Sequence, residues 1–157
     1  MRIFISILLV GSILTAPAYA GDKKPLKPEK KDKCPVCGMF VAKYPDFIAE
    51  IIFRDGSCAF FDGVKDMGKY YFNLEKYNPG KTVRDIDSLY VTDYYDMVLI
   101  DGSQALYVIG SDVYGPMGRE LIPFRTLPDA QEFMRDHRGT AILQFQEITP
   151  KILEGLD

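Results

Sequence analysis

Two cysteines and a methionine lie close together near the start of the chain, within the segment CPVCGM at residues 34–39. Thiolate and thioether sulfur are soft donors that together select Cu(I), which accepts low coordination numbers and needs no histidine. Side chains two positions apart in an extended segment point the same way, so we expect Cys37 and Met39 to share one face. A further soft donor, Met117, lies in the turn-like sequence GPMG, where apolar packing is a poor reason for a methionine. These residues predict a soft-metal site at Cys37 and Met39, with Met117 either as a further donor or as an ordinary loop methionine. Cys34 would be either another donor or a disulfide partner of Cys37.

The cysteine pair has three other interpretations, and each requires companions elsewhere in the chain. A thioredoxin-like redox pair follows a strand and begins a helix, but here a lysine-rich stretch precedes the pair and the non-helical segment MFVAKYPDF follows it. A structural zinc site needs four ligands, and Cys58 and His137 are the only other cysteine and histidine. A disulfide between Cys34 and Cys37 would close a loop too short to constrain the unfolded chain much, and it could also describe the metal-free protein.

An enzymatic function has less support than metal binding. A lyase-like enzyme or a thiol oxidoreductase using Cys34 and Cys37 as nucleophiles would need a general acid or base beside the thiols. The local sequence places neither a carboxylate nor a histidine there, so we expect a protein that is not an enzyme. A non-metal binding module with a disulfide is the remaining alternative.

The other sulfur-containing residues fit structural roles. Met67, Met97 and Met134 lie inside periodic apolar patterns, which predicts that they belong to the core. Cys58 lies in an expected hairpin, and we interpret it as a hairpin residue.

The N-terminal residues have the pattern of a secretory signal peptide at residues 1–20. One basic residue, Arg2, precedes an apolar run, and the small-residue pattern Ala18-Tyr19-Ala20 predicts cleavage after Ala20. The apolar run is shorter than the roughly 20 residues that a bilayer-spanning helix needs, so we expect no stable membrane insertion. No cysteine lies near the cleavage site, which predicts an exported, unlipidated protein that begins at Gly21.

The mature chain is expected to be one domain behind a basic leader. Residues 21–33 are rich in lysine and proline, which predicts a flexible leader. Residues 34–157 are long enough to bury a core without disulfides. The net charge of the whole chain, −3, gives no electrostatic basis for binding nucleic acid or an anionic membrane.

Two segments resemble each other and predict a repeated unit. Residues 50–63 and 96–110 each contain an apolar run, the tripeptide Asp-Gly-Ser and another apolar run. Asp-Gly between two β-prone runs is a strong hairpin signal, because a type I′ turn needs positive φ at both central residues. Since Asp55 and Asp101 are 46 positions apart, we expect two hairpins from a duplicated unit.

Each expected hairpin is followed by a predicted helix. Asp62 is in position to cap the first helix, and the sequence YNPG at residues 77–80 ends it. Thr126 and Asp129 form a capping-box pattern ahead of the second helix, which Gly139 ends.

A further strand is predicted in TAILQFQEI, residues 140–148, because apolar and polar side chains alternate there. The order strand, strand, helix, strand would then occur twice, within about residues 34–90 and 91–157. This order predicts an α+β fold made of two ββαβ units.

These motifs, in this order, resemble the NosL family, the accessory proteins of nitrous oxide reductase maturation. The likeness is carried by CPVCGM at 34–39, by the Asp55-Gly56 turn, by FFDGVKDMGKYY at 60–71 and by YGPMGRELIPF at 114–124. CGM alone is a weak pattern, but its combination with the last of these segments is specific, and the likeness covers nearly the whole mature chain.

The resemblance implies a periplasmic Cu(I) chaperone that serves denitrification by passing copper toward the copper centres of nitrous oxide reductase. It also implies an ABC-type maturation complex at the inner membrane as docking partner, and a fold similar to that of organomercurial lyase. Carried onto this chain, the metal-binding residues of the family are Cys37 and Met39 of CGM and Met117 of GPMG. Many members of the family are lipoproteins, whereas this chain lacks the lipid-acceptor cysteine.

Overall fold

The fold is a mixed α/β structure of short strands and four helices, and the computed structural model describes residues 23–157. The expected signal peptide and its cleavage site lie outside the described residues. The strands are β1 (Ala49–Phe53), β2 (Cys58–Phe61), β3 (Ile86–Thr92), β4 (Leu99–Asp101), β5 (Leu106–Ile109), β6 (Tyr114–Gly115), β7 (Gly118–Arg119), β8 (Ile122–Phe124) and β9 (Ala141–Gln144). The helices are α1 (Val64–Phe72), α2 (Leu74–Tyr77), α3 (Leu127–Asp136) and α4 (Pro150–Glu154), with short 3₁₀ helices at Val41–Lys43, Pro45–Phe47, Val83–Asp85 and Phe145–Glu147.

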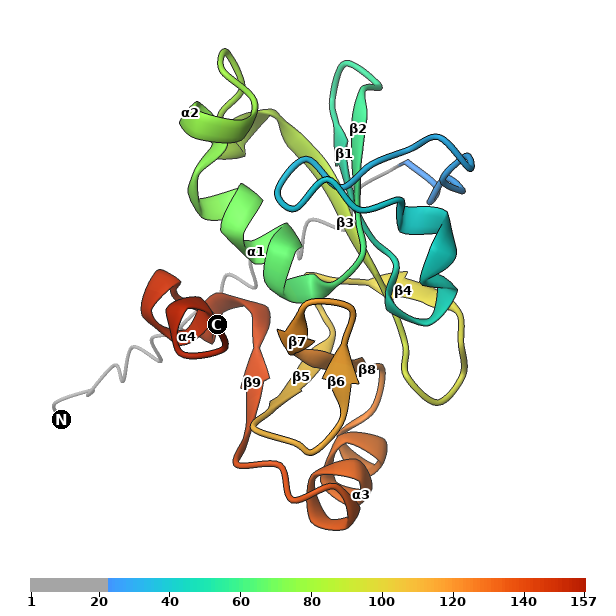
Figure 1. Cartoon of the computed structure of the whole chain (residues 1–157), viewed down its shortest axis with the longest axis vertical. Helices are drawn as coiled ribbons and strands as arrows, with labels where there is room; N and C mark the ends of the chain where they lie inside the picture. Colours follow the sequence, from blue (N-terminus) through green and yellow to red (C-terminus); the bar gives the residue numbers. More distant parts are fainter. Residues whose placement is uncertain (1–22) are drawn as a thin grey trace, which may run out of the picture.

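Two antiparallel sheets lie one above the other along the long axis of the molecule (Figure 1). The upper sheet has the strand order β2-β1-β3-β4, and the lower sheet has the order β8-β5-β9. The small hairpin β6–β7 is a separate ladder between β5 and β8 in the chain, and it lies beneath the start of α1 in Figure 1. The two halves of the chain therefore meet where α1 begins.

The first predicted hairpin is confirmed, but its turn differs from the expected type I′. β1 and β2 pair with Ile51 opposite Ala59. The N–H of Gly56 donates to Phe53 O at 2.9 Å, and Gly56 has a φ of 89° while Asp55 keeps a negative φ. This is a type I turn followed by a left-handed glycine, which spares Asp55 the cost of a positive φ.

The second predicted hairpin is wrong, because its two strands belong to different sheets. β4 pairs with β3, whereas β5 pairs with β8 and β9. The chain crosses between the sheets at Gly102, where a Cβ would meet Leu89, Val91 and Tyr107 at 3.3 Å. The Tyr107 hydroxyl also donates to Gly102 O at 2.5 Å. The Asp-Gly pair at 101–102 therefore permits a close backbone approach and does not close a hairpin.

The 46-residue offset is consequently not an offset between equivalent strands. In chain order, the upper sheet receives β1 and β2, and then β3 after helix α1. The lower sheet receives β5 and β8, and then β9 after helix α3. The middle strand of each triplet is the first in the chain, so the two orders correspond. A common origin by duplication stays a prediction, and the expected boundary between residues 90 and 91 falls inside β3.

Both predicted helices and the predicted further strand are present, but some of their ends and one cap differ from the expectation. The first helix already breaks at Asn73, ahead of YNPG, and the strand ends at Gln144. Thr126 caps α3 by accepting the N–H of Asp129, as expected. α1 begins after Gly63 without a side-chain cap. The Asp62 carboxylate accepts a hydrogen bond from the Cys37 thiol and does not cap this helix.

The methionines predicted to lie in the core divide into two groups. Met67 is 1 % exposed and packs in the main core between the upper sheet and α1. Met134 packs against the second core, between the lower sheet and α3. Met97 is 48 % exposed in the loop before β4 with a φ of 55°, so the core assignment is wrong for this residue.

The segment expected as a flexible leader lies along the upper sheet from Lys23 onward. The Lys23 ammonium donates to Phe53 O at 2.8 Å, and the Tyr90 hydroxyl donates to Lys23 O at 2.6 Å. The N–H of Leu26 donates to Glu50 Oε2 at 2.9 Å. Residues 23–33 are thus part of the fold. Within residues 23–157, no helix has both the length and the apolar character needed to cross a membrane.

Candidate metal centre

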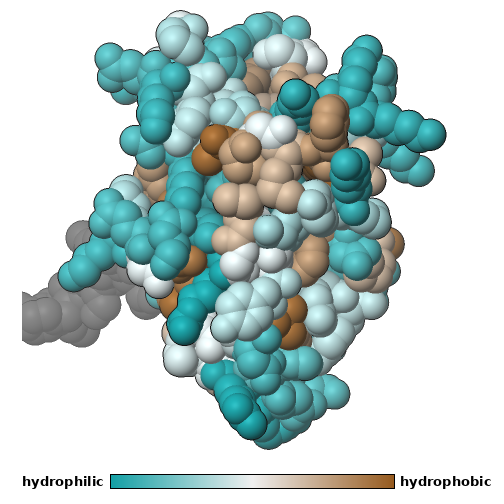
Figure 2. Space-filling view, in the orientation of Figure 1, coloured by the Kyte–Doolittle hydropathy of each residue, from teal (hydrophilic) through white to brown (hydrophobic). Residues whose placement is uncertain are grey.

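The cysteine motif forms a tight loop instead of the expected extended segment. The N–H of Cys34 donates to Met39 O at 2.9 Å, and the N–H of Gly38 donates to Cys34 O at 2.9 Å. Gly38 has a φ of 79°, which favours glycine at this position. The expectation that Cys37 and Met39 share a face because of strand-like alternation is therefore wrong, since Cys37 lies in a turn. Hydrophobic surface gathers in the upper half of the molecule, where this loop passes in front of the sheet (Figure 2).

Two aspartates from the start of α1 face the two thiols. The Cys34 thiol donates to Asp66 Oδ2 at 3.3 Å, and the Cys37 thiol donates to Asp62 Oδ1 at 3.2 Å. One ligand atom from each of these four residues lies within 4.8 Å of the other three. Asp62 directly follows β2 and Asp66 lies in the first turn of α1, so a strand end and a helix start together position the carboxylates. The four side chains form what we call the thiol–carboxylate cluster.

The cluster is buried and rich in negative charge. Cys34, Asp62 and Asp66 are 1 to 3 % exposed, and Cys37 is half-buried. Burial raises the pKa of the Cys37 thiol to about 12, with a further contribution from its hydrogen bond to Asp62. Burial also raises the pKa of Cys34 strongly. Reactive cysteines have lowered pKa values, so this environment opposes a nucleophilic or redox role for the thiols.

Asp62 has one carboxylate oxygen that no described residue satisfies. Its Oδ2 is buried and has no hydrogen-bond partner. A buried polar atom without a partner is costly, and a bound cation is one way to satisfy it.

The predicted donor Met117 lies at the tip of hairpin β6–β7, and contacts with α1 hold this tip in place. The Lys65 ammonium, on a side chain that is 2 % exposed, donates to Met117 O at 2.8 Å. The Glu120 carboxyl accepts the backbone N–H groups of Lys65 at 2.5 Å and Leu121 at 2.9 Å. A Cβ at Gly63 would collide with this carboxyl, so glycine is needed where β2 leads into α1.

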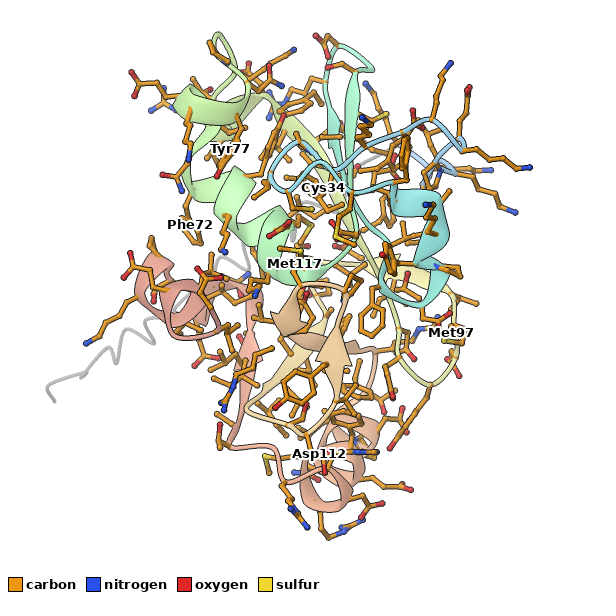
Figure 3. All side chains as sticks on the ribbon, in the orientation of Figure 1. Cys34, Phe72, Tyr77, Met97, Asp112 and Met117 are labelled. Atoms are coloured by element: carbon orange, nitrogen blue, oxygen red, sulfur yellow. The ribbon has the colours of Figure 1, made fainter. Side chains whose placement is uncertain are left out.

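Met117 and Cys34 thus lie at the same end of α1, as Figure 3 shows, although they come from opposite halves of the chain. The Met117 side chain is 44 % exposed and Met39 is half-buried. Cys58 and His137 lie outside the thiol–carboxylate cluster. The His137 ring is hydrogen-bonded to Asp112, which lies at the opposite end of the molecule from Cys34 in Figure 3.

Asp62 and Asp66 are the residues of this site that the sequence did not indicate. The expectation that no carboxylate stands beside the thiols is wrong, and so is the premise that the chain offers too few ligands for zinc. The segment FFDGVKDMG does contain two acids four residues apart, close to the start of a predicted helix. Their approach to Cys34 and Cys37 is a long-range contact that this local spacing does not reveal.

Residues 25–153 match the sequence model of the family described as NosL. The chain belongs to the NosL family. A curated relative, the copper-binding lipoprotein NosL of Stutzerimonas stutzeri, is 28 % identical over 139 residues, which cover 83 % of this chain and 69 % of the relative.

The fold of this NosL protein also resembles that of a solved structure. The copper chaperone NosL from Shewanella denitrificans superposes with a TM-score of 0.70 at 23 % identity, covering 82 % of this chain and 98 % of that structure. The apo-NosL protein from Achromobacter cycloclastes gives a TM-score of 0.47 at 26 % identity, covering 67 % and 87 % of the two chains.

Proposed function

We propose that this NosL protein is a copper metallochaperone, which binds Cu(I) at the cysteine loop and passes it to a recipient protein. The observation that carries the proposal is the convergence of two thiols and a tethered methionine hairpin at one end of α1. Sulfur donors of these two kinds suit Cu(I). The names of the relatives from Stutzerimonas stutzeri and Shewanella denitrificans, which describe copper binding, support the same conclusion.

We assign the ligands as Cys37, Met39 and Met117, with Cys34 as an additional donor. Cys37 supplies the thiolate that neutralises the charge of the metal, and it must lose its proton on binding. Met117 is 44 % exposed and lies at the tip of hairpin β6–β7. An exposed, neutral thioether is the donor that a recipient's ligand could replace first, which suits a carrier.

We propose further that the chain acts in the periplasm after cleavage of its signal peptide. The recipient would be nitrous oxide reductase, reached through its ABC-type maturation complex at the inner membrane. This part of the proposal follows from family membership and from the N-terminal sequence.

One observation favours an enzymatic alternative. Asp62 lies 3.2 Å from the Cys37 thiol, which is the distance expected of a general base beside a nucleophile. The raised pKa of Cys37 argues against this function, because a base-activated nucleophilic thiol has a lowered pKa.

Copper titration of the reduced protein separates these functions. The proposal predicts one tightly held Cu(I) per chain in competition with a chromophoric Cu(I) chelator, and release of that copper to a copper-free recipient. A chain that retains no copper but turns over a disulfide substrate would support the enzymatic alternative.

A further inference from the structure

We infer that the outer edge of β2 and the leader beside it form a docking groove for an extended, acidic peptide segment of a partner protein. The segment would join the upper sheet as an additional strand next to β2, which is a common mode of peptide recognition. The inference goes beyond copper binding, because none of the proposed copper ligands lies on β2 or in the leader.

The main chain of β2 is available along one side. In the strand order β2-β1-β3-β4, β2 is an outer strand, and among residues 23–157 it pairs with β1 alone. The N–H of Phe53 donates to Ser57 O at 2.8 Å, and hydrogen-bonded pairs alternate along an antiparallel ladder. Every second residue from Ser57 onward therefore bonds β1, and the N–H and C=O groups of Cys58 and Phe60 point away from it.

β2 lacks the features that protect exposed strand edges. Natural proteins place charged residues, proline or bulges on such edges, or keep the edge strand very short. The sequence of β2, Cys-Ala-Phe-Phe, contains no charge and no proline, and its register with β1 is regular. β4, at the opposite edge of the same sheet, has three residues and ends in Asp101. The edge of β2 is thus suited to pair with another strand.

The two faces of β2 have different neighbours. Phe61 packs against Tyr70 of α1, with ring centroids 5.1 Å apart. Phe60 points to the opposite face, because neighbouring side chains of a strand alternate. Its partner in the ladder, Glu50, shares that face and accepts the N–H of Leu26 at 2.9 Å. One face of the strand is therefore covered by α1 and the other by the leader.

A cavity of about 580 Å³ lies along the outer edge of β2 and reaches both faces of the strand. Residues 58–60 of β2 all line it, together with side chains from residues 26–33 of the leader. Tyr70 and Tyr77, whose rings stack 6.0 Å apart, line it from α1 and α2. Figure 1 shows the leader in blue on one side of hairpin β1–β2, with α1 and α2 on the other side. We call this cavity and the strand edge that it follows the β2 groove.

The charge of the leader favours an acidic partner. Residues 23–33 contain six lysines and two acidic residues, a net charge of +4, whereas residues 34–157 have a net charge of −7. Lys27 and Lys33 line the β2 groove, and within residues 23–157 neither of them forms an ion pair. A second copy of this chain, paired edge to edge, would bring two basic leaders together, which like-charge repulsion opposes.

The two sides of the groove also specify the pattern of the segment. The leader presents ammonium groups, and α1 and α2 present aromatic rings. Side chains of an added strand would point alternately to these two sides. The segment that fits best therefore alternates acidic residues, which face the leader, with apolar residues, which face Tyr70 and Tyr77.

A synthetic peptide that alternates glutamate and valine is a suitable probe. Fluorescence anisotropy should show that the labelled peptide binds the reduced chain of residues 21–157, and added salt should weaken this binding by screening the charges. Hydrogen exchange at the N–H groups of Cys58 and Phe60 should become slower in the complex. A peptide that alternates lysine and valine is the charge control and should not bind.

Two pairs of variants test the main-chain and the charge contributions separately. Cys58→Pro removes an outward N–H and leaves the bonds to β1 intact, so it should weaken peptide binding by about tenfold or more. Cys58→Ala keeps this N–H and should bind as the wild type does. Lys27→Glu should weaken binding by roughly threefold or more. Lys151→Glu makes the same change of charge at an exposed position on α4 and should have no effect.

Lack of peptide binding by the wild type, or equal binding by the wild type and Cys58→Pro, would overturn the inference. Binding to phosphatidylglycerol vesicles without peptide binding would overturn it in favour of an anionic membrane. A dimer that Cys58→Pro dissociates would overturn it in favour of a second copy.

Thermal denaturation shows whether each variant has folded. If Cys58→Pro has not folded, Lys27→Glu and the hydrogen exchange of Cys58 and Phe60 decide the result. Cu(I) affinity should be the same in every variant as in the wild type. Failure of the docking inference would therefore leave the proposed copper function standing, and loss of Cu(I) binding by the wild type would contradict that function alone.

Discussion

Cys37 is the residue on which the proposed copper site depends most. Its thiol is half-buried and is held beside Asp62. Met39 and Met117 offer neutral thioethers, which are weaker donors than a thiolate. The three proposed donors are thus one thiolate and two thioethers, and their substitutions should rank accordingly.

The first prediction is this ranking of Cu(I) affinities. Cys37→Ser should abolish tight binding, while Met39→Ala and Met117→Ala should each weaken it by a smaller factor. Chelator competition on the reduced proteins measures all three. Met117 is exposed, so its substitution should change the free energy of unfolding by less than about 0.5 kcal/mol.

A specific pattern would contradict the ligand assignment. If Met117→Ala leaves the Cu(I) affinity unchanged while Cys34→Ser abolishes binding, copper is held by the two cysteines alone. The hairpin tip would then have no part in the site.

The sequence singled out the two cysteines of the thiol–carboxylate cluster but not its two acids. CPVCGM and GPMG are local patterns whose chemistry can be read from residue type. Asp62 occupies a position that suits a helix cap equally well, and only the tertiary contact with Cys37 distinguishes the two roles.

At the scale of elements, the contact between α1 and hairpin β6–β7 holds the two halves of the site together. Lys65 is central to it, because its buried ammonium bonds the carbonyl oxygens of Met117 and Leu156. Neither residue is near Lys65 in the sequence. The hairpin tip is therefore held by one helix residue, whose ammonium also bonds the C-terminal segment.

Lys65→Met should loosen this contact. Two carbonyl oxygens would lose a partner, so the free energy of unfolding should fall by about 1–3 kcal/mol. Hydrogen exchange in residues 114–119 should become faster, and Cu(I) affinity should fall. Lys69→Met is the matched control, because Lys69 is more exposed and bonds only Asp157 among the described residues. Equal effects of the two substitutions would show that Lys65 is not the anchor.

A second element-scale prediction concerns Glu50 on β1, which is fully buried beneath the leader. Burial raises the pKa of Glu50 from 4.5 to about 7. Because the folded value exceeds the unfolded value, its contribution to stability is complete below pH 4.5 and is lost as pH rises through 7.

Glu50→Gln should remove this loss. Relative to the variant, the wild-type free energy of unfolding should fall by up to about 1.4 kcal/mol per pH unit between the two pKa values. Denaturant unfolding at several pH values measures the difference. Buried Glu120, whose pKa burial raises to about 8, is present in both proteins and cancels in the comparison. Parallel profiles would contradict the prediction.

Local signals predicted some elements well and others not at all. The capped helix α3 and the hairpin β1–β2 follow from short-range chemistry, which survives in the fold. The Asp-Gly pair at 101–102 carries the same local signal as the pair at 55–56. Its flanking strands β4 and β5 nevertheless pair with strands of different sheets, because long-range packing decides the pairing. The leader is a similar case, because its contacts with Glu50 and Tyr90 cannot be read from its composition.

At the scale of the whole molecule, the site lies where the two halves of the chain meet. The first half supplies the thiols and the carboxylates of the cluster, and the second half would supply Met117, the proposed donor on hairpin β6–β7. The sequence predicted a site between two repeat units, but the strand pairing does not follow that repeat. The correct strand correspondence depends on sheet pairing, which a pattern of single residues does not determine.

The mature protein is predicted to begin at Gly21 without a lipid. The Ala18-Tyr19-Ala20 pattern and the absence of a nearby acceptor cysteine are the reasons. Intact mass spectrometry of periplasmic material should give the mass of residues 21–157. An added acyl mass, or a retained N-terminal segment, would contradict this prediction.

Copper K-edge X-ray absorption of the Cu(I)-loaded, reduced chain tests the central claim most directly. Thiolate and thioether donors predict a first shell made of sulfur at low coordination number, with one sulfur fewer in Met117→Ala. A first shell of nitrogen or oxygen without sulfur would contradict the copper-chaperone account of this site.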